Sequence, residues 1–282
     1  MNAPHALSFD VEEYFQVANL RANFPKVEWG SVPSRLDIGM ERILGALERH
    51  GARATFFFLG WIAERHPVWV ERCLAAGHEV ASHGYDHDFL WDLGPEGARA
   101  DLERTEAALG AAGAPLPRGF RASTFTLTER TLWAFDLLVK RGYRYDSSVH
   151  PVTHPTYGIP RFAPGISTVA REQGSIVEFP VSTKRLFGRN LPVGGGGYFR
   201  LYPGAILRRH LAALEARGES GCLYLHPWEF DPAQPRVETG ALKSFRHYVG
   251  LDKTLVKLEA LLARFAFVGL EECLEARGAL TR

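Results

Sequence analysis

The fold is indicated most directly by residues 54–59, which read Ala-Thr-Phe-Phe-Phe-Leu. This short apolar run is rich in residues that favour strands, and it follows a segment at 35–49 whose apolar residues recur at helical spacing. An earlier short apolar run, at 6–10, precedes that helical segment. Strand, helix and strand in this order predict a βα unit with parallel strands.

The same alternation continues along the chain. Further strands are expected at residues 79–83, 119–122, 143–147, 176–180, 222–226 and 265–269. Further helices are expected at residues 95–112, 129–141, 203–217 and 252–264. Thr126 followed by Glu129 is typical of a capping box and predicts the start of the helix at 129–141. About seven or eight such units predict an α/β barrel, formed by a single domain over residues 1–282, with a long proline-rich loop at 150–171.

Composition and charge exclude several other classes of protein. The 282 residues are 46% hydrophobic and 23% charged, and the formal net charge of +1 gives no general attraction to nucleic acid or to an anionic membrane. Cys73, Cys222 and Cys273 are far apart and odd in number, which predicts buried free thiols rather than a disulfide framework. Neither a secretory leader nor a transmembrane stretch is visible in the sequence, so we expect a cytoplasmic protein.

Side chains capable of chemistry recur at the carboxyl ends of the predicted strands, where parallel βα folds assemble their active sites. They are Asp10, Glu12, His83, His87, Arg121, Asp146 and His226. Two imidazoles and one carboxylate would leave a ligand position open, as in catalytic zinc sites, although His83 and His87 could equally be satisfied histidines of a polar loop. Asp10 and Glu12 should point the same way if strand geometry persists, and a solvated acidic loop is the alternative.

The other candidates each have a structural alternative. His226 ends an apolar strand, where a satisfied core histidine is the ordinary interpretation. Arg121 and Asp146 could form a simple ion pair between two strands, or could orient and tune a catalytic carboxylate. Their shared position along successive strands favours a common site.

Taken in order, these motifs resemble those of the NodB-homology polysaccharide deacetylases, whose fold is a distorted (β/α) barrel. The matching segments are Asp10 to Glu12, His83-Gly84-Tyr85-Asp86-His87, Arg121-Ala122-Ser123-Thr124, Asp146, and Leu223 to His226. Two positions depart from the family pattern. Val11 stands where the family has a metal-binding aspartate, so Glu12 must supply that carboxylate, and Ser123 replaces a proline.

A closer resemblance is to the subgroup associated with exopolysaccharide and exosortase loci. It rests on three further segments, namely residues 9–15, 195–200 and 245–248, and it implies a subgroup-specific C-terminal part from about residue 231. The segment Phe245-Arg246-His247-Tyr248 is interpreted either as a substrate contact or as a surface loop docked on the barrel.

The resemblance implies a metal-dependent deacetylase acting on an N-acetylated glycan. Glu12, His83 and His87 would hold a divalent metal, most simply Zn²⁺, with Co²⁺ or another divalent ion as alternatives. Asp10 would act as the base and His226 as the general acid.

Further residues take supporting roles in this interpretation. Arg121 and Asp146 would orient the base, a backbone N–H near Thr124 would stabilise the oxyanion, and Leu225 would wall a pocket for the acetyl methyl group. The aromatic residues expected to stack on sugar rings, or else to pack in the core, are Tyr14, Phe15, Trp228, Tyr198 and Phe199.

Two rival functions remain open at this point. The first is a related C–N hydrolase acting on a small cyclic amide or ureide. The second is a carbohydrate-binding barrel whose metal site has been lost through Val11.

Overall fold

The computed structural model describes residues 4–281, and a nine-stranded sheet dominates this range. Its strands are β1 (His5–Val11), β2 (Thr55–Phe58), β3 (Glu79–Ser82), β4 (Gly119–Phe120), β5 (Tyr145–Asp146), β6 (Ser167–Arg171), β7 (Gly174–Glu178), β10 (Cys222–Leu225) and β11 (Phe267–Val268). The order is β10-β1-β2-β3-β4-β5-β7-β6, and β11 also pairs with β1. Every pairing is parallel except that of β6 with β7.

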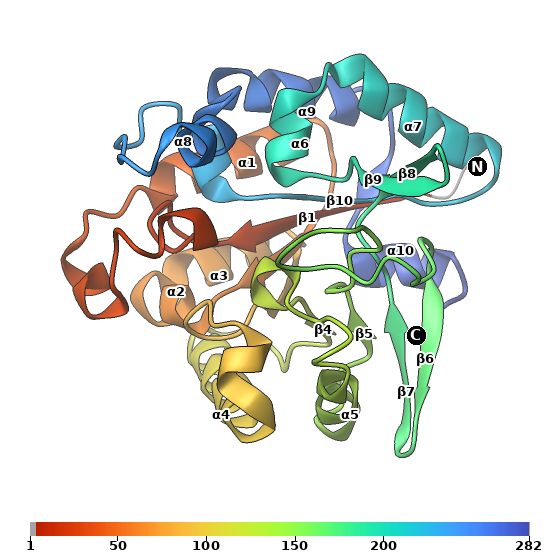
Figure 1. Cartoon of the computed structure of the whole chain (residues 1–282), viewed down its shortest axis with the longest axis horizontal. Helices are drawn as coiled ribbons and strands as arrows, with labels where there is room; N and C mark the ends of the chain where they lie inside the picture. The colour runs from red at the N-terminus through yellow and green to blue at the C-terminus, as the bar shows by residue number, and fades with distance from the viewer. Residues whose placement is uncertain (1–3, 282) are drawn as a thin grey trace.

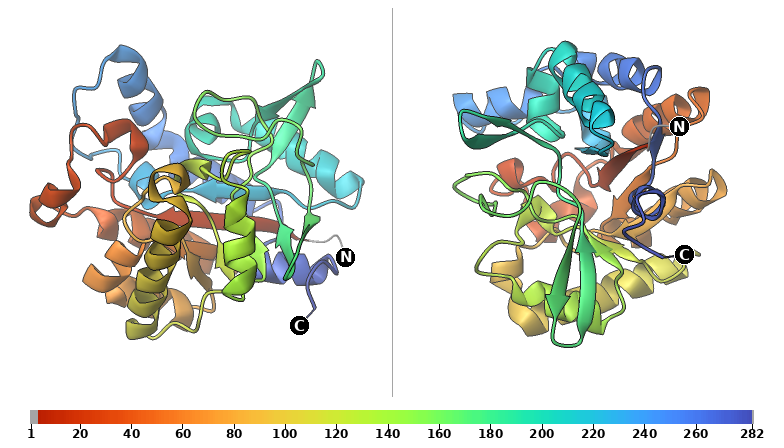
Figure 2. Two further views of the ribbon diagram at one scale, coloured as in Figure 1. Left: turned by 60° about the horizontal axis from the view of Figure 1, so that its bottom comes forward. Right: turned by 90° about the vertical axis from the view of Figure 1, so that its right-hand side faces the viewer.

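Helices cover the outside of this curved sheet (Figures 1 and 2). They are α1 (Leu36–Arg49), α2 (Gly60–Arg65), α3 (Pro67–Ala75), α4 (Leu90–Ala111), α5 (Trp133–Lys140), α6 (Gly196–Leu201), α7 (Gly204–Ala216), α8 (Ala241–Tyr248), α9 (Thr254–Leu262) and α10 (Leu270–Ala276). Figure 1 shows α6, α7 and α9 on one side of β1 and β10, and α2, α4 and α5 on the other. Among the described helices, none is both long and apolar enough to cross a membrane.

The first strand illustrates how the sequence builds the two faces of the sheet. Phe9 and Val11 belong to the main hydrophobic core, while Ser8 and Asp10 face the opposite way and contact Arg121. This is the period-two alternation of an extended strand. Glu13 comes after the strand, and its carboxylate accepts hydrogen bonds from the backbone N–H groups at the start of α1. Ser8 and Asp10 are therefore directed to the inside of the barrel, whereas His5 lies against Phe265 and Phe267 on the core face.

The barrel is distorted between β7 and β10, which do not pair with each other. A separate antiparallel hairpin, β8 (Thr183–Leu186) and β9 (Arg189–Pro192), interrupts the chain here. The backbone N–H of Ser182 donates to Cys222 O (3.0 Å), and that of Tyr224 donates to Gly194 O (2.9 Å). A Cβ on Gly195 would lie 1.9 Å from Tyr224 O, so this close approach requires glycine. The expected α/β fold with a distorted barrel is confirmed.

Several local expectations were wrong. The helix expected at 129–141 begins at Trp133, because the Thr126 hydroxyl donates to Ser123 O in a preceding turn instead of capping a helix. The helices α2, α3, α6, α8 and α10 and the hairpin of β8 and β9 were not predicted. The predicted loop at 150–171 ends where β6 begins, and the hairpin of β6 and β7 extends away from the barrel in Figure 1. The three cysteines of the described chain are buried and free, as expected.

Candidate active site

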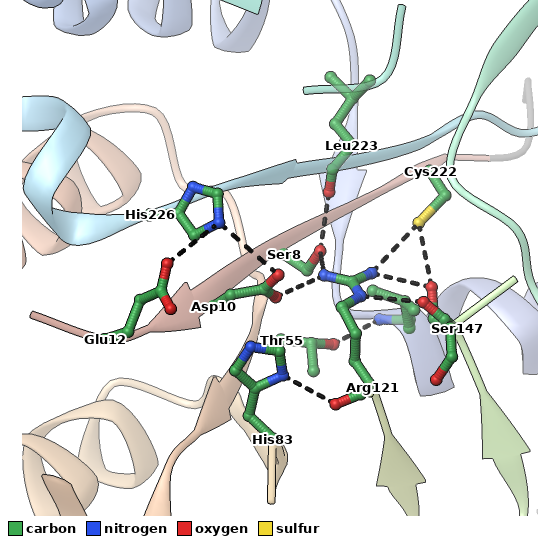
Figure 3. A network of polar contacts seen from close by, with 12 residues as sticks. Ser8, Asp10, Glu12, Thr55, His83, Arg121, Ser147, Cys222, Leu223 and His226 are labelled. Carbon is green, nitrogen blue, oxygen red and sulfur yellow. Dashed lines mark hydrogen bonds and ion pairs between the residues drawn. The ribbon is translucent and has the colours of Figure 1, made fainter. Parts of the chain in front are cut away.

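Strand register brings the predicted site residues to one edge of the sheet. Phe120 pairs with both Ser82 and Asp146, so His83 and Arg121, the next residues along their strands, leave the sheet side by side. On the other side of β1, Phe9 pairs with Leu225, which places His226 beside Asp10. Figure 3 shows the His226 imidazole directed at the carboxylates of Asp10 and Glu12. Its Nε2 lies 4.0 Å from Asp10 Oδ2 and 3.5 Å from Glu12 Oε1.

Glu12, His83 and His87 form a cluster suited to a metal ion. Each offers one ligand atom, these atoms lie within 4.8 Å of one another, and all three residues are buried. Glu12 Oε2 is 2.9 Å from His87 Nε2, yet it forms no hydrogen bond within residues 4–281. One carboxylate oxygen and two imidazole nitrogens are a donor set typical of catalytic zinc. The orphaned oxygen and the chemistry of the donors both fit a divalent cation.

Neighbouring groups fix the orientation of these ligands. His83 Nδ1 lies 2.7 Å from Arg121 O, and because a carbonyl can only accept, Nδ1 carries the proton and Nε2 is free for a metal. The Trp228 indole N–H donates to Glu12 Oε1 at 3.2 Å. The cluster is thus held by contacts beyond the ligands themselves.

The loop from His83 to His87 has an unusual backbone. Gly84 has φ +76°, and a Cβ there would lie 2.8 Å from Asp101 Oδ2. The same oxygen accepts a hydrogen bond from the backbone N–H of Tyr85. His87 also adopts a left-handed conformation, with φ +56°. This conformation is uncommon for residues other than glycine and often marks functional sites. The tight curl returns the second imidazole toward Glu12.

The electrostatics of the cluster favour a charged Glu12 carboxylate and a neutral His83 imidazole. Burial raises the pKa of Glu12, but the adjacent His87, His226 and His83 outweigh it and lower that pKa to about 2. Burial lowers the pKa of His83 to about 4. An ionised carboxylate and neutral imidazole are the forms that bind metal.

Asp10 is held by a fully buried arginine. Arg121 Nη1 donates to Asp10 Oδ1 at 2.6 Å and to Ser8 Oγ at 2.7 Å (Figure 3). Its Nε donates to Ser147 O at 3.0 Å, and its Nη2 to Ser147 Oγ at 2.8 Å. These bonds fix one Asp10 oxygen and leave Oδ2 on the side of His226.

His226 is bound on its other nitrogen by a residue that we had not predicted. Its Nδ1 is 3.1 Å from Glu229 Oε1. Burial alone would lower the pKa of His226, but Glu229 and then Glu12 and Asp10 raise it to about 9. The imidazole is therefore protonated at neutral pH in the metal-free chain.

Asp146 does not occupy the position that we expected. Its carboxylate accepts hydrogen bonds from Ser148, at 2.5 Å from Oγ and 3.0 Å from the backbone N–H. Burial raises the pKa values of both Asp146 and its neighbour Glu178, and contact between the two carboxyls adds to this for Glu178. Asp146 is connected to the Arg121 segment by Ser148, whose Oγ accepts a hydrogen bond from the Ala122 N–H at 2.7 Å. Asp146 thus supports the loop after β4, and its expected pairing with Arg121 is corrected.

The expected acetyl pocket also needs correction. Leu225 is 0% exposed and lies in the main core, because adjacent residues of β10 point to opposite faces. Tyr224 shares the inner face with His226, and its ring contacts those of His226 and Phe125. Next to it, the short turn after β4 carries Thr124, which is half-buried and left-handed at φ +54°. Tyr224 therefore takes the place expected for Leu225.

Burial separates the aromatic candidates. Tyr14 and Phe15 are buried, and their rings contact each other and Phe24. Trp228 is 9% exposed and stacks against both His226 and His247, so a sugar-stacking role for Tyr14 or Trp228 is corrected. Tyr198 is half-buried and keeps an accessible face.

The residues that the sequence missed all lie after residue 195. Glu229, Arg200 and His247 surround His226 and Trp228 within the described chain. A faint signal existed for Glu229, since it follows His226 by three residues in a short turn containing Pro227. Arg200 and His247 fall in the subgroup-specific segments, but nothing in their local pattern predicts that they meet.

Comparison with known proteins shows which families this arrangement resembles. Fold and site together define an α/β-barrel protein with a cluster of side chains that could hold a metal ion. Residues 36–145 match the family model for polysaccharide deacetylase, and residues 147–275 match a domain of unknown function, DUF3473. Over residues 36–145 the chain is thus similar to the polysaccharide deacetylase family. The sheet is continuous across both matches, because β5 pairs with β7, and β10 with β1.

Two relatives are similar to part of this chain, and one solved structure shares its fold. A peptidoglycan-N-acetylglucosamine deacetylase of Bacillus cereus is 33% identical over 94 residues, covering 33% of this chain and 34% of that protein. The peptidoglycan deacetylase-like protein FGM2 of Gibberella zeae is 29% identical over 114 residues, 40% of this chain and 33% of that protein. The chain thus matches about a third of the length of these relatives. A Mycobacterium smegmatis structure provisionally described as a polysaccharide deacetylase shares the fold, with a TM-score of 0.65 at 21% identity, covering 100% of this chain and 95% of that one.

Proposed function

We propose that this protein is a metal-dependent hydrolase that removes N-acetyl groups from the amino sugars of a polysaccharide or of its precursor. The observation that carries the proposal is the position of His226 Nε2, which lies 4.0 Å from Asp10 Oδ2 and 3.5 Å from Glu12 Oε1, with His83 and His87 beside Glu12. A base, an acid and a metal-type donor set are the parts needed to hydrolyse an unactivated amide. The names of the deacetylase relatives support the same reaction and an N-acetylglucosamine-type substrate.

Glu12, His83 and His87 would hold the metal. Zn²⁺ suits their donor set best, and Co²⁺ or another divalent ion would also fit. Such an ion supplies a Lewis acid that polarises the acetamide carbonyl and acidifies water.

Asp10 and His226 would move the protons. Asp10 accepts a proton from the attacking water through Oδ2, while Arg121 holds Oδ1 by a hydrogen bond. His226 donates a proton from Nε2 to the departing nitrogen, so that the products are acetate and a free amine.

Substrate contacts come from the mouth of the barrel. A backbone N–H near Thr124 would stabilise the oxyanion, since the left-handed turn there leaves backbone groups free to face a ligand. Tyr224 would take the part assigned to Leu225 beside the acetyl methyl group, and Tyr198 would contact a sugar ring. The resemblance of segments 9–15, 195–200 and 245–248 to an exopolysaccharide-associated subgroup supports a glycan of that kind.

Acetate release from N-acetylglucosamine oligomers tests the proposal. Metal-stripped protein is assayed with and without added Zn²⁺ or Co²⁺, alongside His83→Ala as the variant without a complete ligand set. We expect release that requires metal and falls to background in the variant. Metal uptake near one equivalent without acetate release from any glycan would overturn the substrate and favour a cyclic amide or ureide. Neither uptake nor release would favour a carbohydrate-binding barrel.

A further inference from the structure

Glu229 lies directly behind the His226 imidazole, on the side away from the metal cluster. It belongs to the short helical turn Pro227–Phe230, whose backbone bends back so that the Glu229 N–H donates to His226 O at 3.0 Å. The carboxylate is 0% exposed, and its Oε1 is 3.1 Å from His226 Nδ1. A buried carboxylate at this distance accepts the Nδ1–H and thereby directs Nε2 toward Asp10 and Glu12.

The same carboxylate is anchored by Arg200. This arginine is 4% exposed, and its Nε lies 3.5 Å from Glu229 Oε1. Its remaining nitrogens bind backbone carbonyls at and just after the end of α8, with distances of 2.6 Å to His247 O, 2.9 Å to Val249 O and 3.1 Å to Arg246 O. Arg200 therefore joins the turn that follows β10 to the segment 246–249.

A second contact ties that segment to His226. The His247 ring stacks on Trp228 with centroids 4.5 Å apart, and Trp228 stacks in turn on His226 at 5.2 Å. His247 Nε2 also lies 3.0 Å from Gln234 Oε1, whose amide nitrogen donates to Trp228 O at 2.8 Å. The imidazole of His226 is thus held in its plane by Trp228 and at its Nδ1 by Glu229.

We infer that Glu229 is the positioning residue for the acid His226, and that Arg200 fixes Glu229 by tying it to α8. This inference rests on the proposed deacetylase function. The sequence assigned a tuning role to Asp146, but for the base Asp10, and the Asp146 carboxylate binds Ser148 instead. Glu229 and Arg200 give the acid a support of its own, and both lie, like His226, in the region matched to the domain of unknown function.

Burial alone does not account for this carboxylate. Glu229 Oε2 has no hydrogen bond within the described chain, and an apolar side chain of similar size would fill the space without the cost of a buried charge. The retained carboxylate is explained by its contact with His226 Nδ1. Tautomer control of this kind in other hydrolases affects turnover far more than substrate binding.

The test compares Glu229→Ala and Glu229→Gln with Glu79→Gln, all as zinc-loaded enzymes. Glu79 is a control at the opposite end of the barrel, where it accepts hydrogen bonds from the hydroxyls of Thr55 and Tyr145. We expect Glu229→Ala to lower kcat about 100-fold, to change KM less than about threefold and to keep full zinc uptake. Glu229→Gln keeps an acceptor for Nδ1–H and should recover about tenfold of that loss, while Glu79→Gln should retain the kcat of the wild type.

A second readout is independent of activity. In zinc-loaded protein labelled with ¹⁵N-histidine, the Nδ1–H of His226 should give a protected downfield proton resonance that is retained in Glu79→Gln and lost in Glu229→Ala. If the wild type releases no acetate, the proposed function fails, and this resonance alone decides whether Glu229 holds the ring. An unchanged kcat or an unchanged resonance in Glu229→Ala would overturn the inference. Loss of zinc uptake together with activity would also overturn it, since Glu229 would then maintain the whole site rather than one ring.

Discussion

Two buried arginines support the two groups that would transfer protons in the proposed function, and they do so in different ways. Arg121 is 0% exposed and binds Asp10 at 2.6 Å, while Arg200 is 4% exposed and lies 3.5 Å from Glu229. Arg121 also donates hydrogen bonds to Ser8 in β1 and to Ser147, which follows β5. Arg200 instead donates hydrogen bonds to backbone carbonyls around the end of α8.

The pKa values reflect this difference. Burial lowers the pKa of both guanidinium groups, but for Arg121 the contact with Asp10 outweighs burial and the pKa is raised. For Arg200 burial outweighs Glu229 and the pKa is lowered. The side of the proposed base is therefore a tight ion pair inside the barrel, whereas the side of the proposed acid depends on residues 246–249, which lie outside it. Under the proposed function, these two regions would each secure one half of the chemistry.

The largest effect is expected from Arg121→Ala. The variant leaves Asp10 buried without its cation, which costs about 3–5 kcal/mol of unfolding free energy, and removes the orientation of the base. Urea unfolding measures the loss of stability, and acetate release measures the loss of activity. The matched control is Arg53→Ala, which breaks an exposed ion pair with Glu272 and should cost less than about 1 kcal/mol of unfolding free energy. A loss no greater than the control's would mean that the tight pair does not stabilise the barrel.

A smaller loss, about 2–3 kcal/mol, is expected from Arg200→Ala. The carbonyls it releases lie beside a mostly exposed helix and can bind water, so only part of the lost hydrogen bonding counts against the folded state. Limited proteolysis should show faster cleavage within residues 231–250 than in the wild type. The comparison breaks down if Arg200→Ala destabilises the protein as much as Arg121→Ala, or if cleavage is unchanged.

The smallest effect is expected in acid and concerns His247. Burial lowers its pKa to about 3, against an ordinary value of 6.5 in the unfolded chain. The unfolded state therefore binds more protons between these values, and stability falls as the pH drops through this window, by up to about 1.4 kcal/mol per pH unit.

Unfolding free energies at pH 7 and pH 5 measure this contribution. His247→Gln should lose about 2 kcal/mol less than the wild type between the two pH values. The control is His50→Gln, at an exposed position just after α1, which should lose as much unfolding free energy as the wild type between the two pH values. Equal losses of unfolding free energy in His247→Gln and in the wild type would show that residues 246–249 unfold locally before His247 is protonated.

Local pattern predicted most of the strands but fewer of the helices. The apolar runs ending at Asp10, His83, Arg121 and His226 were placed correctly to within a residue or two. The helices α2 and α3 were missed because Pro67 divides residues 60–75 into two segments too short to show a helical period. An error of one residue along a strand was enough to misplace a side chain of the site, because adjacent residues point to opposite faces. Leu225 was chosen for the inner face, which Tyr224 occupies.

The sequence by itself determined which groups gather at the carboxyl edge of the sheet. Strand alternation sends Asp10 to the inner face, and parallel pairing brings the ends of β1, β3, β4 and β10 together. Only the tertiary structure decided which charged side chains contact each other. Arg200 and Glu229 are 29 residues apart and meet because α6 and the turn after β10 pack against the same α8 segment. Contacts of that kind depend on long-range burial, which leaves no period in the sequence.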